Sequence, residues 1–245
     1  MENLFQEAKN LIADSKNIYI LSLPEREEGV TCALALFYTL KELDKNVNLV
    51  IDEMPERLKF LTPSLDYVSY PRNFAISIPN SKAEISQIRY EKDEKDLKVY
   101  LTIDKGNIKK NDISFCYTTP KADLVIAIGL KELNYTNQLG SLENGVLLNA
   151  PVLNIDNQEE NKNFGKVNLI RQSYPLAEYL ISFIKFNNEN LITAPAATAL
   201  LTSLIIFCDN FQNQKTSPEI LERAALLIKK GAKRQEILDN LYKQK

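Results

Sequence analysis

The sequence contains no histidine, the residue that most often ligates transition metals and acts as a general base. Cysteine is also scarce, because only Cys32, Cys116 and Cys208 occur, far apart and in apolar surroundings. An odd number of widely spaced cysteines supplies neither a disulfide framework nor a C-x-x-C zinc or redox pair. The chain therefore lacks the common ligands of transition-metal chemistry, and we expect its cysteines to be small core residues.

An excess of charge of one sign is missing as well. Lys and Arg number 30 and Asp and Glu 32, which gives a formal net charge of -2, and both signs are scattered along the chain. Without a basic stripe, nucleic-acid binding by charge alone is not indicated. The first residues are acidic and amphipathic rather than basic and then apolar, so no secretory signal is expected and we predict a cytoplasmic protein.

One long run lacks charge. Residues Leu191–Cys208 contain no charged side chain, and this length reaches the lower limit for crossing a bilayer. Pro195 is typical of a helix start, and the run also contains several threonines and a serine. We therefore predict a fully buried core helix over 196–208 and no membrane partner.

Short apolar runs alternate with helical patterns along much of the chain. Continuous apolar strands indicate burial on both faces, which is typical of a parallel sheet covered by helices. We predict an α/β fold with a doubly wound, mainly parallel sheet and helices on both faces. The expected strands are 18–21, 47–51, 124–128 and 152–155. A helix at 4–12 is expected before the first strand, and helices at 30–43 and 131–139 are expected between strands.

Two parts of the chain depart from this alternation. Within about 74–117, residues 83–90 and 97–103 alternate polar with apolar around a charged tip at 91–96, which predicts an inserted antiparallel β-hairpin with a solvated turn. From about 173 to 245 the chain becomes helical. Helices are expected at 175–186, 196–208, 218–230 and 234–242. We expect residues 1–245 to form a single α/β domain that carries the hairpin as an insert.

A polar motif follows the predicted strand 152–155. It reads Asn154-Ile155-Asp156-Asn157-Gln158 and continues with Asn161, Phe164-Gly165 and Asn168. This motif resembles the N-I-D-H-H segment of the DHH phosphoesterase family, in which it supplies ligands to a two-manganese site. Other segments in matching order extend the resemblance over most of 17–242 outside the insert. The resemblance implies an α/β fold and a phosphoesterase related to oligoribonucleases and pAp phosphatases.

The metal-binding motifs of that family are degenerate here. Of the ligands that the resemblance implies, Asp156 alone is kept with its identity. The shortened first loop offers Glu27 and Glu28 as its acidic residues. Gly129 takes the ligand position after the second strand, and Asn157 and Gln158 take the positions of two histidines. Phe207 takes the position of the last aspartate, with Asp209 two residues further on. We also expect the family's glycine-rich carboxy-terminal domain to be absent, since the chain has only seven glycines.

Two metal ions about 3.5 to 4 Å apart need bridging carboxylates and several further ligands. Asp156, with Glu28 as a second weak candidate, cannot supply such a set, so no metal or other cofactor is expected. A single Mg²⁺ or Mn²⁺ would be needed only if a rebuilt carboxylate site were active. Asp156 is equally compatible with a structural role, in which its side chain caps the following turn.

Three functional hypotheses remain open at this stage. The first is a non-catalytic relative that acts as a scaffold, a regulatory subunit or a binder of a nucleotide or other phosphorylated ligand. The second is a metal-dependent phosphoesterase acting on short oligonucleotides or nucleotide phosphates, with a rebuilt site at Asp156, Glu27 or Glu28, and Asp209. The third is an assembly subunit, with a protein partner or a second copy bound through the exposed edge of the hairpin.

Overall fold

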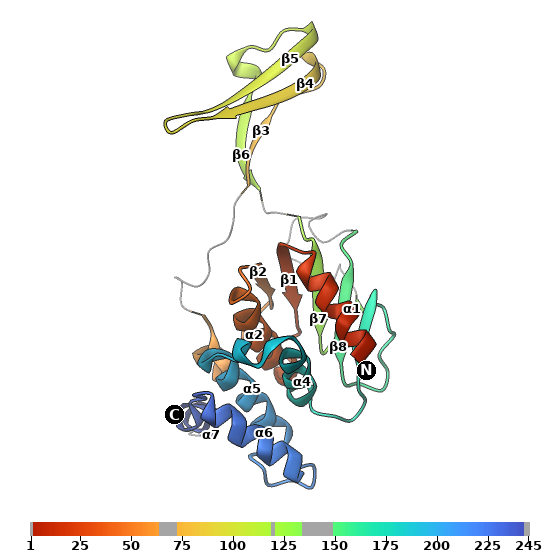
Figure 1. Ribbon diagram of the computed structural model, residues 1–245, viewed down its shortest axis with the longest axis vertical. Coiled ribbons are helices and arrows are strands. Elements are labelled where there is room, and N and C mark those ends of the chain that lie inside the picture. Colours follow the sequence, from red (N-terminus) through yellow and green to blue (C-terminus); the bar gives the residue numbers. More distant parts are fainter. Residues whose placement is uncertain (1, 64–72, 119–120, 134–148, 243–245) are drawn as a thin grey trace. The chain divides into compact units, whose positions relative to one another are not determined.

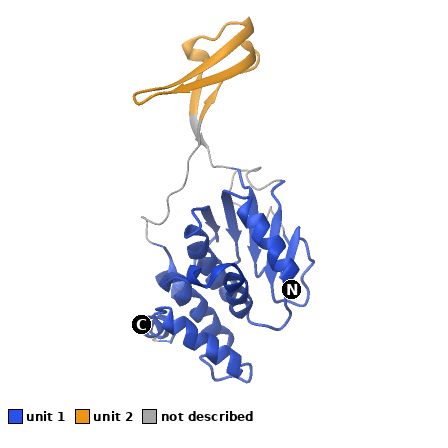
Figure 2. Ribbon diagram, viewed as in Figure 1, with its two compact units in different colours: residues 1–70, 121–245 blue, residues 71–120 orange. Residues whose placement is uncertain are grey.

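The computed structural model describes residues 2–63, 73–118, 121–133 and 149–242. The chain divides into two compact units, one made of residues 1–70 and 121–245 and the other of residues 71–120 (Figure 2). The larger unit contains the parallel sheet and the helices. The smaller unit contains the insert.

Five parallel strands form the central sheet of the larger unit, as expected for its continuous apolar runs. In spatial order they are β2 (Asn46–Val50), β1 (Asn17–Leu21), β7 (Leu124–Ile128), β8 (Val152–Asp156) and β9 (Val167–Ile170). The predicted α/β fold with a mainly parallel sheet is confirmed. Strand β9 was not expected, because its four residues Val167–Ile170 carry only a weak alternating pattern.

The helices of the larger unit follow the predicted order (Figure 1). They are α1 (Glu2–Ala13), α2 (Glu27–Lys41), α4 (Leu176–Asn188), α5 (Ala194–Phe207), α6 (Pro218–Lys229) and α7 (Arg234–Tyr242), with short 3-10 helices η1 (Glu56–Leu61) and η4 (Glu189–Leu191). Helix α2 begins at Glu27 rather than at the predicted Val30. The carboxylates of Glu27 and Glu28 favour this earlier start, because acidic side chains stabilise the first turn of a helix.

Helix α5 is the buried centre of the helical layer, as its lack of charge predicts. Ten of its residues, from Ala196 to Ile205, are buried, and Pro195 lies in its first turn. The α5 helix packs mainly on α2 and also contacts α4 and α6. None of the helices in the described part of the chain is long and apolar enough to span a membrane.

The two faces of the sheet are covered differently in the described residues. Ile18 and Ile20 point to one face and pack with the main core, which draws side chains from α1, α2, α4 and α5. Tyr19 and Leu21 point to the other face and pack with residues of β7 and β8 and of nearby loops. The helix expected over 131–139 lies outside the described residues from residue 134 onward.

The smaller unit contains two antiparallel two-stranded ribbons. Strands β4 (Ala83–Lys92) and β5 (Leu97–Gly106) form the predicted hairpin. The backbone N–H groups of Lys95 and Asp96 donate to Asp93 at its tip. Strands β3 (Asn73–Ser77) and β6 (Ser114–Thr118) form a second ribbon, and the 3-10 helix η3 (Lys110–Asp112) precedes β6. The sequence did not predict this second ribbon, because its strands are short and far apart in the chain.

Candidate functional site

The candidate site lies beyond the carboxyl ends of β1, β7 and β8. The chain leaves β1 for β2 on one side, whereas β7 pairs with β1 on the other side, so the strand order reverses between β1 and β7. Open parallel sheets bind ligands at such a switch point. A pocket of about 370 Å³ occurs here, lined by Leu23, Glu25, Arg26, Gly129, Lys131, Glu132 and Gln158.

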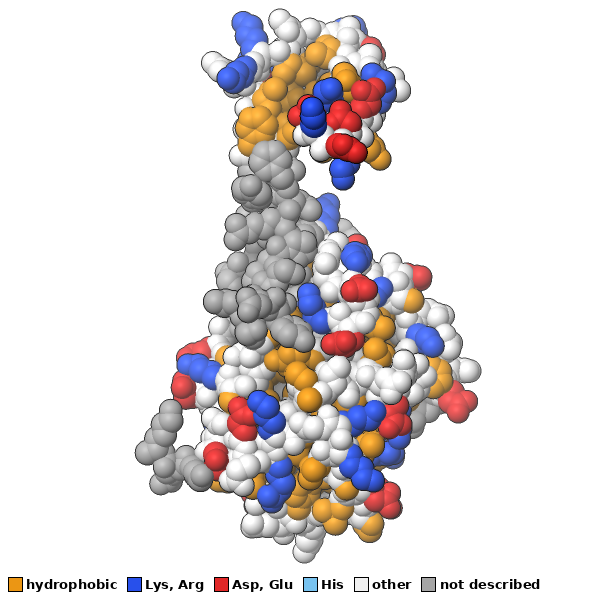
Figure 3. All heavy atoms as spheres, turned by 60° about the vertical axis from the view of Figure 1, so that its left-hand side comes forward, with side chains coloured by type: hydrophobic (Ala, Val, Ile, Leu, Met, Phe, Trp, Pro, Cys, Tyr) orange, Lys and Arg blue, Asp and Glu red, His pale blue; other side chains and the backbone are white. Residues whose placement is uncertain are grey.

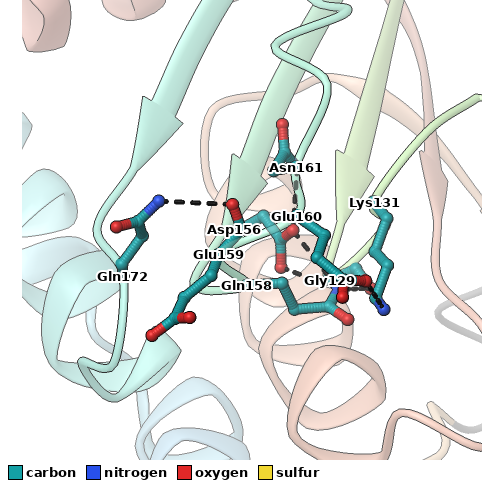
Figure 4. A network of polar contacts seen from close by, with 8 residues as sticks. All are labelled: Gly129, Lys131, Asp156, Gln158, Glu159, Glu160, Asn161 and Gln172. Atoms are coloured by element: carbon teal, nitrogen blue, oxygen red, sulfur yellow. Dashed lines mark hydrogen bonds and ion pairs between the residues drawn. The ribbon is translucent and has the colours of Figure 1, made fainter.

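Asp156 ends strand β8 and is completely buried. Its carboxylate accepts hydrogen bonds from Asn161 Nδ2 at 2.7 Å and from the backbone N–H of Asn157 at 2.8 Å. Gln158 Nε2 donates to both carboxylate oxygens, at 3.1 and 3.2 Å. Figure 4 shows Asn161 and Gln158 on opposite sides of this carboxylate. Asp156 is thus surrounded by N–H donors.

The orientations of these two amides are set by backbone groups. Asn161 Nδ2 also donates to the carbonyl of Leu130 at 2.8 Å, and Asn161 Oδ1 accepts from the backbone N–H of Asn163 at 2.8 Å. Gln158 Nε2 likewise donates to the carbonyl of Gly129 at 3.0 Å. Because a carbonyl can only accept and a backbone N–H can only donate, both amides present nitrogen, not oxygen, to Asp156.

The other asparagines of the motif support Asn161. Asn154 is completely buried, and its Nδ2 donates to Asn161 Oδ1 at 2.8 Å and to Asn168 Oδ1 at 3.0 Å. Asn168 in turn exchanges two hydrogen bonds with the backbone of Gly165. A Cβ at Gly165 would lie 2.9 Å from Asn154 Cβ, so a side chain has no room there. These residues form the turn framework of the motif.

Glu28 is turned toward helix α4. Its Oε1 accepts from the backbone N–H of Leu176 at 2.6 Å, and its Oε2 accepts from Asn157 Nδ2 at 3.1 Å. Burial raises the pKa of Glu28, although both hydrogen bonds and the nearby charge of Arg26 act in the opposite direction. Glu28 therefore caps the amino-terminal end of α4.

Glu27 is engaged by a different partner. Its carboxylate forms a bidentate ion pair with Arg57 of η1, in which Arg57 Nε donates to Glu27 Oε1 at 2.6 Å and Nη2 donates to Oε2. This pair ties the first turn of α2 to η1. Glu27 and Glu28 are sequence neighbours, yet their carboxylates bind different elements.

Asn157 and Arg26 connect the motif to the pocket. Arg26 Nη2 donates to Asn157 Oδ1 at 3.0 Å, and Asn157 Nδ2 also donates to the carbonyl of Tyr174. Arg26 Nε is buried and has no hydrogen-bond partner among the residues that the structure describes. Arg26 also lines the pocket, although no motif in the sequence indicated this role. Its position just before α2 was its only signal in the sequence.

The remaining candidates lie at strand and helix ends. Gly129 has a φ of 71°, a conformation that favours glycine, and a Cβ added there would contact Gly29 Cα at 3.4 Å. Phe207 ends α5 and is covered by Lys215, whose Nζ lies 4.9 Å from the ring centroid. Asp209 is exposed beyond the helix end. Burial raises the pKa of Tyr242, and the charge of Asp209 raises it further, which places Asp209 close to α7.

Comparisons with known proteins point in the same direction as the motif. The chain is 31% identical over 97 residues to the bifunctional oligoribonuclease and PAP phosphatase NrnA of Thermus thermophilus, a match that covers 40% of this chain and 30% of that protein. These findings support a DHH phosphoesterase-like chain. No family model matches the sequence.

A solved structure shares the fold. The exopolyphosphatase-related protein from Bacteroides fragilis superposes with a TM-score of 0.68 and 13% identity, covering 100% of this chain and 62% of that one. The chain thus spans less than two thirds of the length of either protein. At this identity the structural match shows the α/β architecture alone.

The side chains at the site do not fit the two-metal centre that the resemblance implies. A cation beside Asp156 would meet the N–H groups of Asn161 and Gln158, which repel positive charge, instead of further oxygen ligands. The described residues contain no group of three or more Asp, Glu, Cys or His side chains that could hold a metal ion. The carboxylate of Glu27 is bound by Arg57, and that of Glu28 is bound by the backbone N–H of Leu176.

Proposed function

We propose that this chain is a non-catalytic DHH phosphoesterase-like protein that binds a phosphorylated ligand, a nucleotide or a short oligonucleotide, without hydrolysing it. The observation that carries the proposal is the arrangement of N–H donors around the carboxylate of Asp156. In this arrangement the one kept metal-ligand position is a hydrogen-bond acceptor inside the protein. A protein that binds this ligand without converting it would have a regulatory or scaffolding role.

The absence of catalysis rests on the chemistry of phosphoester hydrolysis. A two-metal site stabilises both the attacking and the leaving oxygen of the displacement and lowers the pKa of a bound water. With no histidine, and with Glu27 and Glu28 bound elsewhere, the described residues offer no replacement for either role. Hydrogen bonds alone orient a phosphate but leave water a weak nucleophile.

Binding is supported by the pocket at the strand ends. Arg26 supplies a guanidinium that lines this pocket, and a guanidinium donates charge-assisted hydrogen bonds to phosphate oxygens. Among the described residues, no side chain caps the amino-terminal end of α2, which follows Arg26 directly, so the first backbone N–H groups of this helix can donate to an anion. Glu25 and Glu132 also line the pocket, so the expected recognition is by directed hydrogen bonds rather than by a basic surface.

Two measurements test the two parts of this proposal. Purified protein is incubated with Mn²⁺, with Mg²⁺ or with chelator, on short oligoribonucleotides, pAp and a generic phosphodiester, beside Asp156→Asn. We expect no turnover above the buffer blank. Metal-dependent turnover that disappears in Asp156→Asn would overturn the non-catalytic assignment.

Binding is measured by calorimetry with pAp and with a dinucleotide, in the presence of chelator. We expect Arg26→Gln to weaken binding at least about tenfold, because a charge-assisted hydrogen bond to phosphate is lost. Arg234→Gln, an exposed arginine of α7, is the matched control and should bind as the wild type does. No binding by the wild type would refute the ligand-binding part and leave a purely structural scaffold.

The alternative function, a phosphoesterase with a rebuilt carboxylate site, would need Asp156, Asp209 and Glu27 or Glu28 to converge on one metal ion. The contacts of these side chains favour no such convergence among the described residues. The turnover assay above is also the test of this alternative.

A further inference from the structure

The β4–β5 ribbon has one apolar face and one charged face. Directly opposed residues of an antiparallel pair point to the same side, and Tyr90 pairs with Val99 while Ile88 pairs with Leu101. Alternation along the strands adds two more apolar side chains to this side. We call it the ribbon face, made of Ile88, Tyr90, Leu97, Val99, Leu101 and Ile103.

The opposite side is polar and internally paired. Arg89 forms an ion pair with Glu91 at 2.8 Å and lies over the ring of Tyr100, whose hydroxyl donates to Glu91. Ser86 donates to Asp104 on this same side. A solvated side of this kind needs no cover.

The ribbon face, by contrast, is left open. Ile88 is 69% exposed, Tyr90 74% and Leu97 63%. Most of the exposed large hydrophobic side chains of the described chain lie in residues 71–120, and Figure 3 shows them gathered on this unit. An apolar patch of this kind marks an interaction surface.

A two-stranded ribbon is marginally stable in water unless a further layer covers its apolar side. Strands β4 and β5 pair only with one another in the described chain, as a sheet of two strands. Ten-residue strands with an uncovered apolar face therefore indicate a covering layer from outside the ribbon.

We propose that the ribbon face is a dimerisation surface, covered by the ribbon face of a second copy of this chain. The inference is independent of the proposed function. Six side chains of this size present roughly 600 Å² per copy, so that two faces bury about 1,200 Å², which reaches the range of stable interfaces. In a dimer with twofold symmetry both copies contribute the same surface, so each ribbon face buries its apolar side chains against the other.

The charges at the ends of the ribbon face agree with a twofold arrangement. Lys92 lies at one end, opposite Leu97, and Glu84 lies at the other end, where it pairs with Lys105 at 3.6 Å. An antiparallel twofold pairing brings Lys92 of one copy next to the ion pair between the partner's Glu84 and the partner's Lys105. The contact then has an apolar centre and a charged rim, as protein interfaces commonly do.

The test is the mass of the full-length chain in solution, by light scattering and sedimentation from low to high micromolar concentration. We expect a dimer for the wild type. The double variant Ile88→Thr/Val99→Thr keeps β-branched side chains, which suit a strand, but makes the face more polar. It should raise the dimer dissociation constant at least about tenfold. Lys98→Thr, on the polar side, is the matched control and should remain dimeric.

Cross-linking supplies a second readout that does not depend on affinity. Val99→Cys, at the middle of the ribbon face, should form a disulfide-linked dimer under mild oxidation above the wild-type background. Lys98→Cys, on the opposite side, should not. A wild type that is monomeric at every concentration would overturn the proposal. The ribbon face would then be covered by a different protein or by another part of this chain. A dimer that the Ile88→Thr/Val99→Thr variant leaves unchanged would also overturn it.

Discussion

Glu28, in the first turn of α2, accepts a hydrogen bond over 2.6 Å from the backbone N–H of Leu176, the first residue of α4. The two residues are 148 positions apart in the sequence. The second oxygen of Glu28 accepts from Asn157, directly after Asp156. The motif loop, α2 and α4 are therefore held together by one carboxylate, which links the stability of the site to the ionisation of Glu28.

This linkage predicts a pH-dependent stability. Because burial raises the pKa of Glu28 above its ordinary value of 4.5, the folded protein binds its proton more tightly than the unfolded chain does. The free energy of unfolding of the wild type, relative to Glu28→Gln, should then fall as the pH rises from 4.5 through the raised pKa, and be flat above it. Urea unfolding of both proteins between acidic and neutral pH measures this difference. A difference that grows with pH would contradict the assignment.

Replacement of Asp156 should destabilise the protein, because its carboxylate satisfies Asn161, Gln158 and the backbone N–H of Asn157. Asp156→Ala leaves these buried donors without an acceptor and should cost about 3 kcal/mol. Glu159→Ala, an exposed neighbour, should change the free energy of unfolding by less than about 0.5 kcal/mol. Urea unfolding in the presence of chelator is the measurement. A variant as stable as the wild type would favour a ligand role for Asp156 over a structural one.

Gly129 should be sensitive to a single methyl group. Its φ of 71° is unfavourable for other residues, and an added Cβ would lie 3.4 Å from Gly29 Cα. Gly129→Ala should lower the free energy of unfolding by about 1 to 2 kcal/mol. Asn163→Gly, at a φ of 50°, is the reciprocal control and should be neutral or slightly stabilising. Equal effects of both substitutions on thermal unfolding would show that backbone conformation is not the cause.

The parallel sheet and the buried helix α5 could be predicted because their patterns are local. Strands such as Leu124–Ile128 are continuously apolar, and α5 lacks charge and contains a proline in its first turn. Strand β9 and the β3–β6 ribbon were missed. Their segments are short, and their pairing partners, such as Ile76 and Phe115, meet only in the folded unit.

The location of the candidate site at the strand ends follows from a general rule that the sequence also allows, since ligands bind beyond the carboxyl ends of parallel strands. The contacts within it were not. Arg26 was overlooked, although it lines the pocket and donates to Asn157. Asn161 is a donor to Asp156, a contact that the motif did not indicate.

The amino-acid sequence by itself determined which chemical groups this protein contains. It has no histidine, and one aspartate remains in a motif that resembles a metal-binding motif. Only the tertiary structure decided what those groups face. Asp156 meets amide nitrogens, Glu27 meets Arg57, and Glu28 meets the end of α4. The physical reason is that each polar group, once buried, must find a partner, and these partners come from segments far apart in the chain that meet only when the helices pack on the sheet.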